Sequence, residues 1–249
     1  MKRVIAGVLL LLLAFSGCSK EIGETVANES GTTFSCISIE MLTEFRDFGS
    51  FAASPAGEAE AARRLVCGAL EQYPEGFPEQ WGRVEILLVG ELTGRADFAG
   101  ERYAGFTQRV GDGWLMVLDA ERCDAGTVHH EIAHILDGIL TEAGALTEAE
   151  WMALCPADFT YGPGDWLAYP DFFADAYAMT DIREDRARTF EEAMLHGPGV
   201  YADRPALWLK LDCLSRAIRA HFDTAGWPAE TAWELAQKNS GNFAADVIP

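Results

Sequence analysis

The segment 127–138, TVHHEIAHILDG, contains two histidines at a spacing that suits a single bound metal ion. His130 and His134 are four residues apart, so on a helix their imidazoles lie on one face and can reach the same ion. Glu131 follows the first histidine and can face a metal-bound water, whose pKa zinc lowers towards about 7. The spacing predicts a Zn²⁺ site with His130 and His134 as ligands and Glu131 as the general base.

The surrounding residues favour a helix. Apolar residues recur at helical spacing after Glu131, and Asp124 or Thr127 can cap the start of the helix. Gly138 stands where we expect the helix to end. His129 lies about 100° around the helix from its neighbouring histidine, so we expect it to have a structural or supporting role.

A catalytic zinc normally has three protein ligands and one open position. A third histidine within the same motif is excluded, because Leu140 occupies its place. The segment 171–180 is predicted as a helix, and Asp171 and Asp175 form an i, i+4 pair on one of its faces. Asp165, in YGPGDWLAY, is a further candidate, so the third ligand is one of these three carboxylates.

Two segments together carry a resemblance to a known family. VHHEIAHIL and DFFADAYAMTDIREDRARTFEEAM resemble zinc-binding metallopeptidases found among bacterial lipoproteins, and the second segment also resembles the catalytic domain of anthrax lethal factor, a gluzincin. The resemblance covers roughly residues 83–196 and implies a zincin-like fold. It also implies that Asp171 is the third ligand and that Asp175 supports a ligand histidine. Both are aspartates where the family usually has glutamate, so the helix must lie closer or the other acid must bind.

Hydrolysis of an amide passes through a tetrahedral intermediate that a hydrogen-bond donor can stabilise. In related enzymes a tyrosine before the third-ligand helix does this, and here Tyr161 is the candidate, with Tyr169 as the alternative. The predicted strand 114–120 could form the lip of the cleft and pair with an extended peptide.

The N-terminal sequence predicts export. Lys2 and Arg3 precede an apolar run that is short for a membrane span, and FSGC then resembles a bacterial lipobox ending at Cys18. We therefore expect a signal peptide over 1–17 and a lipid on Cys18. The protein would then lie in the cell envelope, anchored to a membrane, with the outer membrane or the cell surface favoured by Ser19.

The polar range 18–35 is predicted as a flexible tether and 36–249 as the folded domain. The order of elements in that domain, one helix, then two strands at 83–90 and 114–120, then mostly helices, predicts an α+β fold with a small sheet packed on the zinc-binding helix. The other five cysteines are an odd number, so at most two disulfides can form.

Composition limits the partners. The chain has 39 acidic and 19 basic residues, a formal net charge of −20, which excludes nucleic acid as a partner on electrostatic grounds. We expect an exported, lipid-anchored zinc metallopeptidase that hydrolyses peptide bonds by glutamate-assisted attack of zinc-bound water on a protein or peptide. The alternatives are a zinc-bound binding protein with weak catalysis on a peptidase fold, and a zinc hydrolase of non-peptide amides.

Overall fold

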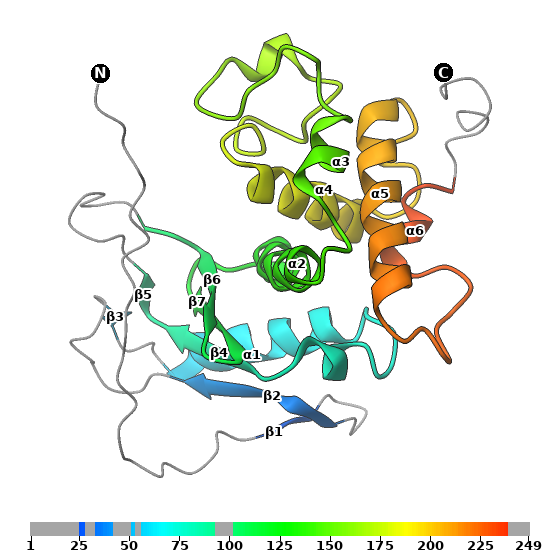
Figure 1. Cartoon of the computed structure of the whole chain (residues 1–249). Coiled ribbons are helices and arrows are strands. Elements are labelled where there is room, and N and C mark those ends of the chain that lie inside the picture. The colour runs from blue at the N-terminus through cyan, green and yellow to red at the C-terminus, as the bar shows by residue number, and fades with distance from the viewer. Residues whose placement is uncertain (1–24, 28–32, 42–50, 53–55, 93–101, 239–249) are drawn as a thin grey trace.

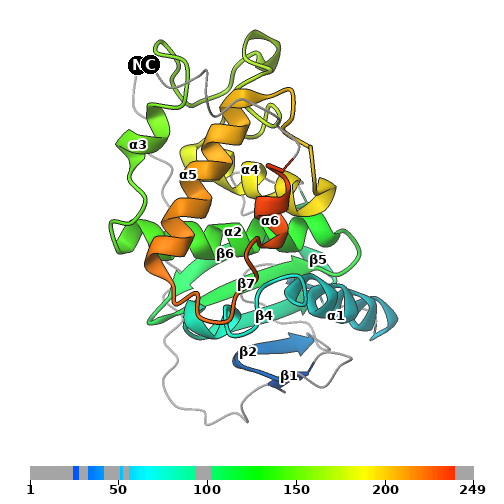
Figure 2. The same ribbon diagram turned by 90° about the vertical axis from the view of Figure 1, so that its right-hand side faces the viewer.

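The structure is a computed structural model and describes residues 25–27, 33–41, 51–52, 56–92 and 102–238. A small sheet forms one layer, helix α2 crosses its face, and the later helices lie on the far side of α2 (Figure 1). Figure 2 shows α2 along its length, between the sheet and helices α4 and α5. The expected α+β class is confirmed. Cys18 and the range 1–17 lie outside the described residues.

The strands form one sheet of five and one of two. Their bounds are β1 (Thr25–Ala27), β2 (Thr33–Met41), β3 (Phe51–Ala52), β4 (Val84–Val89), β5 (Glu91–Leu92), β6 (Gly105–Val110) and β7 (Gly113–Asp119). The larger sheet has the order β1-β2-β4-β7-β6, with parallel pairing at β2–β4 and β4–β7 and antiparallel pairing at both ends. Strands β4 and β7 confirm the two predicted strands. Strand β1 and the start of β2 fall inside the range 18–35, so the sheet begins earlier than residue 36.

The position of β7 corrects one expectation about the cleft. Strand β7 is hydrogen-bonded to β4 on one side and to β6 on the other, so it is an internal strand and not a lip. Strand β6 is the end of the order in the sheet as described, and it packs against α2. Strand β6 was not predicted, because its sequence, GFTQRV, lacks the long apolar run by which β4 and β7 were recognised as buried strands.

The described helices follow the predicted ones closely. Their bounds are α1 (Ala56–Leu70), α2 (Ala125–Glu142), α3 (Glu148–Met152), α4 (Ile182–His196), α5 (Pro205–His221) and α6 (Ala232–Leu235), with short 3₁₀ turns at Pro78–Trp81 and Trp166–Ala168. Asp124 is the N-cap of α2, and its carboxylate accepts from the backbone N–H of Thr127 at 2.8 Å. Within the described part of the chain, no helix combines the length and apolar character needed to cross a membrane.

Gly138 does not end α2, which continues to Glu142. A Cβ atom at Gly138 would lie 2.2 Å from Cη2 of Trp114, so the glycine is there to let the helix approach the indole of β7. The sequence-based expectation of a helix end was wrong because close packing, not a turn, selects this glycine.

We therefore expect Gly138→Ala to destabilise the fold, although alanine is the better helix former. Alanine gains up to about 1 kcal/mol in helix propensity, whereas overpacking a core costs about 1–3 kcal/mol. Urea unfolding should show a lower free energy of unfolding for Gly138→Ala. Gly68→Ala in α1 is the matched control, because nothing lies within 4 Å of that Cβ position, and it should be neutral or stabilising.

The predicted helix over 171–180 is wrong. The segment forms turns and bends, with no helix. Its backbone carbonyls are bound by side chains instead: Lys210 donates to the carbonyl of Phe172 at 2.7 Å, and Trp166 donates to the carbonyl of Phe173 at 3.1 Å. Arg204 also donates to the carbonyl of Phe173. These long-range donors replace the amide partners that a helix would supply.

Candidate metal centre

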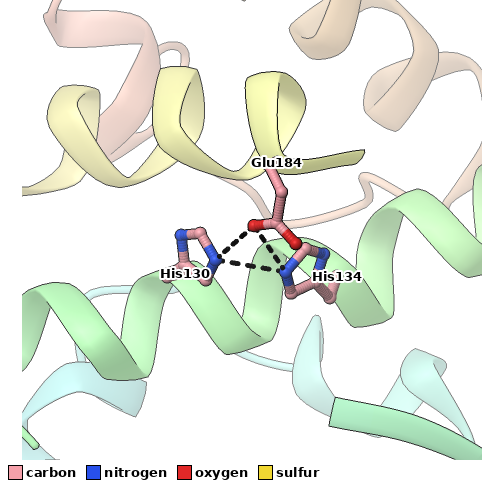
Figure 3. A group of neighbouring side chains, drawn as sticks. All are labelled: His130, His134 and Glu184. Atoms are coloured by element: carbon pink, nitrogen blue, oxygen red, sulfur yellow. Dashed lines mark hydrogen bonds and ion pairs between the residues drawn. The ribbon is translucent and has the colours of Figure 1, made fainter. Parts of the chain in front are cut away.

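Three side chains from two helices converge on one point (Figure 3). His130 and His134 lie on α2, and Glu184 reaches them from the first turn of α4. Their candidate ligand atoms all lie within 4.8 Å of one another. The Nε2 atoms of the two histidines are 3.1 Å apart, and Glu184 Oε2 is 3.1 Å from His130 Nε2 and 3.5 Å from His134 Nε2.

This arrangement fits a tetrahedral zinc ion. With metal–ligand distances of 2.0–2.2 Å, neighbouring ligand atoms of a tetrahedral site are separated by about 3.3–3.6 Å. The three separations here are 3.1, 3.1 and 3.5 Å, so only small side-chain shifts would be needed to reach that range. Two imidazoles and one carboxylate are also a ligand set that leaves one zinc position open for water or substrate, as in catalytic sites.

The charges of the three groups are arranged to receive a cation. Burial lowers the pKa of His130, but hydrogen bonds to Glu184 and Glu191 outweigh it and raise that pKa to about 9. Burial raises the pKa of Glu184, and the hydrogen bonds to His130 and His134 reverse this effect and hold it well below its usual range. Both shifts have the same origin, the close contact of the Glu184 carboxylate with the two imidazoles, which is the contact that a shared cation would reinforce.

Glu131 lies beside these ligands on α2 and packs against strand β6 at Gly105. Its side chain is almost fully buried, and its Oε2 atom has no hydrogen-bond partner among the described residues. Burial raises the pKa of Glu131, while the nearby His134 and His130 act in the opposite direction. A buried carboxylate with a raised pKa and a free oxygen has the properties of a general base for neutral pH.

Glu191 orients the first histidine. Its Oε2 atom lies 3.1 Å from His130 Nδ1, the ring nitrogen on the other side from the candidate ligand atom. Arg188 forms an ion pair with Glu191 and another, at 2.8 Å, with Asp175. Carboxylates that bind the second nitrogen of a ligand histidine fix its ring and its tautomer. The predicted supporting role of Asp175 is therefore indirect, through Arg188 and Glu191.

We expect Glu191→Gln to weaken zinc binding by about 10–100-fold, because outer partners of ligand histidines have effects of that size. The measurement is zinc affinity by competition with a chromogenic chelator. Glu192→Gln is the matched control, since its carboxylate lies 3.6 Å from Arg188 and 3.8 Å from the exposed His196 and does not belong to the converging group. Equal zinc affinities of the two variants would contradict the orienting role of Glu191.

Two buried ion pairs join the start of α4 to neighbouring helices, one to α5 and the other to α2. Asp185 Oδ2 accepts hydrogen bonds from Lys210 Nζ at 2.7 Å, Tyr161 at 2.7 Å and Trp151 at 2.8 Å. Because Asp185 follows Glu184 directly, this network fixes the position of the third candidate ligand relative to α5 and α3. Removing one partner of such a buried pair typically costs 3–5 kcal/mol.

The second pair joins α4 to α2. Arg186 NH1 lies 2.7 Å from Asp137 Oδ1, and both side chains are buried. Asp137 lies one turn beyond His134 on α2, so this contact sets the distance between the helix with the histidines and the helix with Glu184.

The carboxylates predicted as the third ligand lie elsewhere. Asp171 is exposed on the turn after Pro170 and does not belong to the converging group. Asp165 is also exposed and caps a 3₁₀ turn by accepting from the backbone N–H of Leu167 at 3.0 Å. Asp175 binds Arg188, as described above. The helix over 171–180 on which the assignment of Asp171 depended does not form, and in the described residues it is Glu184 that joins the two histidines in the group that could hold a metal ion.

The tyrosine assignment also changes. The hydroxyl of Tyr161 donates to Asp185 at 2.7 Å and contacts Cys155 Sγ at 3.6 Å, so it belongs to the buried hydrogen-bond network around Asp185. Tyr177 lies beside the metal ligands instead, with its ring centroid 6.1 Å from that of His130, and it is half exposed. Burial and then the charge of Glu184 raise the pKa of Tyr177, which keeps its hydroxyl protonated as a donor.

His129 lies in the core, which agrees with the structural role expected from the sequence. It is fully buried, and its Nδ1 atom lies 2.9 Å from the hydroxyl of Tyr73. Burial lowers its pKa to about 4, so the ring is neutral.

One signal in the sequence could have identified the third ligand. Glu184 and Glu191 lie seven residues apart on the predicted helix 183–195, so they share one face after two turns. The i, i+4 pair of aspartates was an equally good pattern, but it required a helix in a segment that follows Pro170.

Comparisons with known proteins bear on the fold. No protein-family model matches the chain, and a search of curated proteins finds no match. Among solved structures, the chain is similar to a crystal structure of a candidate zinc-binding metallo-peptidase from Bacteroides caccae, with a TM-score of 0.50 and 14% identity. The match covers 82% of this chain and 83% of that one. The chain therefore has a mixed α+β fold similar to that of a protein so described, and it carries a His–His–Glu group that could hold a metal ion. The resemblance to lethal factor stays a sequence-based prediction.

Proposed function

We propose that this protein is a zinc-dependent peptidase whose metal ligands are His130, His134 and Glu184. The observation that carries the proposal is the convergence of these three side chains at tetrahedral spacing, with Glu131 next to the first of them on the same helix. A purely structural metal site would need neither an open position nor a buried carboxylate beside it.

The roles of the side chains follow from their positions. A bound zinc ion would supply Lewis acidity, which lowers the pKa of water and polarises a carbonyl. Glu131 accepts the proton of the attacking water and then gives it to the leaving amine, and its burial keeps it in a water-poor environment for both transfers. Glu191 holds the ring of His130 in a fixed orientation throughout.

Tyr177 is the proposed donor to the developing oxyanion. Its position beside His130 and its half-exposed ring suit a side chain that borders the open side of the metal centre. A hydroxyl that stays protonated can donate a hydrogen bond to the charge that forms in the transition state. Tyr161 is less suited to this role, because its hydroxyl lies in the buried network of Asp185 with Trp151 and Lys210, away from the converging ligands.

We propose a protein or peptide outside the cytoplasm as the substrate, with the enzyme tethered to the cell envelope through a lipid on Cys18. The support for export and anchoring is the sequence MKRVIAGVLLLLLAFSGC itself. The support for a polypeptide substrate is the combination of the metal centre with a sheet whose end strand, β6, lies next to Glu131.

The first test is the metal content of the protein purified without chelator. The proposal expects about one zinc per chain, retained by His196→Ala and lost by His130→Ala. His196 is a suitable control because it is an exposed histidine at the end of α4 and lies outside the converging group. Absence of zinc from the parent protein, even after incubation with zinc, would overturn the proposal.

The second test separates peptide hydrolysis from its alternatives. Zinc-loaded protein should cleave unfolded proteins or members of a peptide library, and a chelator should abolish the cleavage. Stoichiometric zinc without cleavage of any peptide would favour a binding protein on a peptidase fold. Cleavage of non-peptide amides alone would favour the other hydrolase class, because zinc chemistry by itself does not distinguish these substrates.

A further inference from the structure

Strand β6 approaches the candidate base so closely that a side chain at Gly105 would crowd it. A Cβ atom at Gly105 would lie 3.1 Å from Cγ and 3.1 Å from Oε1 of Glu131, and 2.9 Å from Cδ2 of Leu118. Leu118 is the residue directly opposite on β7, so the methyl group would meet both the base and the neighbouring strand. A side chain at residue 105 would therefore press the carboxylate of Glu131 out of its present position by a few tenths of an ångström.

Backbone conformation does not explain this glycine. The glycines with a positive φ include Gly111, in the turn that joins β6 to β7, but not Gly105. Any residue could adopt the extended backbone of β6 at this position, so the requirement at Gly105 is for space.

A second residue of β6 binds the same part of α2. The hydroxyl of Thr107 donates to the backbone carbonyl of Glu131 at 3.3 Å. Residues two apart on a strand share a face, so Gly105 and Thr107 both face α2. One contact fixes the helix backbone at Glu131, and the other leaves room for its carboxylate.

The carboxylate of Glu131 is held by polar contacts on one side only. Its Oε2 atom has no hydrogen-bond partner in the part of the chain that the structure describes, and the side chain is only 4% exposed. The hydroxyl of Thr107 and the charges of His134 and His130 also act on this carboxylate. Packing against β6 therefore contributes to where the carboxylate lies. A base must lie within about 2.6–3.2 Å of the proton it takes, so its position matters directly for catalysis.

We infer that Gly105 is a positioning residue for the base: the missing side chain lets Glu131 lie against β6, while Thr107 holds the helix to the same strand. This inference rests on the proposed peptidase function. A misplacement of about 1 Å far from the bond being broken can cost about 100-fold in rate. A methyl group at Gly105 acts on the base itself, without touching His130 or His134.

The first experiment compares Gly105→Ala with the parent in zinc affinity and in steady-state cleavage of a peptide that the parent cleaves. The expected result is a fall in kcat of about 10–100-fold with KM and zinc affinity each within about twofold of the parent. Gly113→Ala is the matched control, because its Cβ would lie 2.6 Å from the backbone oxygen of Arg83, in the same sheet but against a different residue. That variant should lose stability and keep kcat. An unchanged kcat in Gly105→Ala would overturn the inference.

A second experiment needs neither metal nor substrate. In a double-mutant cycle with Glu131→Ala, followed by urea unfolding of the metal-free protein, removal of Cγ and Oε1 should relieve the crowding at residue 105. The stability lost through Gly105→Ala should therefore be smaller when residue 131 is alanine. Additive losses would overturn the inference even if the parent proved to have no peptidase activity, so the two failures are distinguishable.

Thr107→Val covers the case in which Gly105→Ala does not fold. Valine keeps the shape of the side chain and removes the hydroxyl that binds the carbonyl of Glu131. A lower kcat at unchanged zinc affinity is expected, and an unchanged kcat would contradict the positioning role of β6.

Discussion

Glu184→Gln should lose its zinc, whereas Asp171→Asn should keep it. Glutamine has nearly the same shape as glutamate but carries no negative charge, so it is a much weaker zinc ligand. Because Glu184 is one of the three donors that converge among the described residues, we expect its loss to weaken zinc binding by more than the 10–100-fold typical of residues that support a ligand. Peptide cleavage should fall with zinc occupancy.

Asp171→Asn is the matched control for this prediction. It makes the same chemical change at an exposed carboxylate of the turn after Pro170. The measurement is zinc affinity by chelator competition, together with the rise in melting temperature on adding zinc, since a ligand that binds only the folded state stabilises it. Zinc loss in Asp171→Asn and zinc retention in Glu184→Gln would reverse our assignment of the third ligand.

The second large effect is expected from Glu131→Gln, which should bind zinc as tightly as the parent and cleave peptides about 10²–10⁴ times more slowly. Glutamine fills the same buried space next to β6 but cannot accept a proton. The two ligand histidines on the same helix are unchanged, so the metal centre should persist.

Glu142→Gln makes the same change on the same helix and is the appropriate control. Its side chain is mostly exposed and lies 3.6 Å from Arg109, so the variant should retain both zinc and activity. Measuring kcat and KM separately would distinguish loss of chemistry from loss of substrate binding. A Glu131→Gln variant that cleaves as fast as the parent would exclude the proposed mechanism.

Both predictions depend on a polar helix at the centre of the fold. Helix α4 has the sequence IREDRARTFEEAMLH, which by composition resembles an exposed helix. The structure buries Asp185 and Arg186, and each has a partner of opposite charge on another helix. Buried charges are tolerated when they are paired, and these pairs place Glu184 opposite the histidines of α2. Helix α4 thus supplies the candidate ligand Glu184, and its buried charged residues Asp185 and Arg186 hold that ligand in place.

Local patterns in the sequence were sufficient for one half of the site. His130, Glu131 and His134 lie within five consecutive residues, so helical geometry alone brings the two imidazoles to one face. The strands β4 and β7 and the helices on either side of α2 were equally predictable, because their apolar periodicity and caps are properties of short segments.

Tertiary structure decided the other half. The proposal of Glu184 in place of Asp171 depends on the non-helical path of 171–180, where Lys210, Trp166 and Arg204 donate to the carbonyls of Phe172 and Phe173. Such contacts join residues more than thirty positions apart in two of the three cases, and no local pattern encodes them. The choice of Tyr177 over Tyr161 depends in the same way on the buried carboxylate of Asp185.

The two glycines show the same division. Gly138 and Gly105 are recognisable in the sequence only as residues without a side chain, and Gly138 was expected to end a helix. Each glycine leaves room for a side chain on another element. Gly138 leaves room for the indole of Trp114, and Gly105 leaves room for the carboxylate of Glu131. The sequence by itself determined the chemistry of the α2 motif, because its residues are neighbours along one helix. Only the packing of α4 and β6 against that helix decided which carboxylate completes the metal centre and where the base lies.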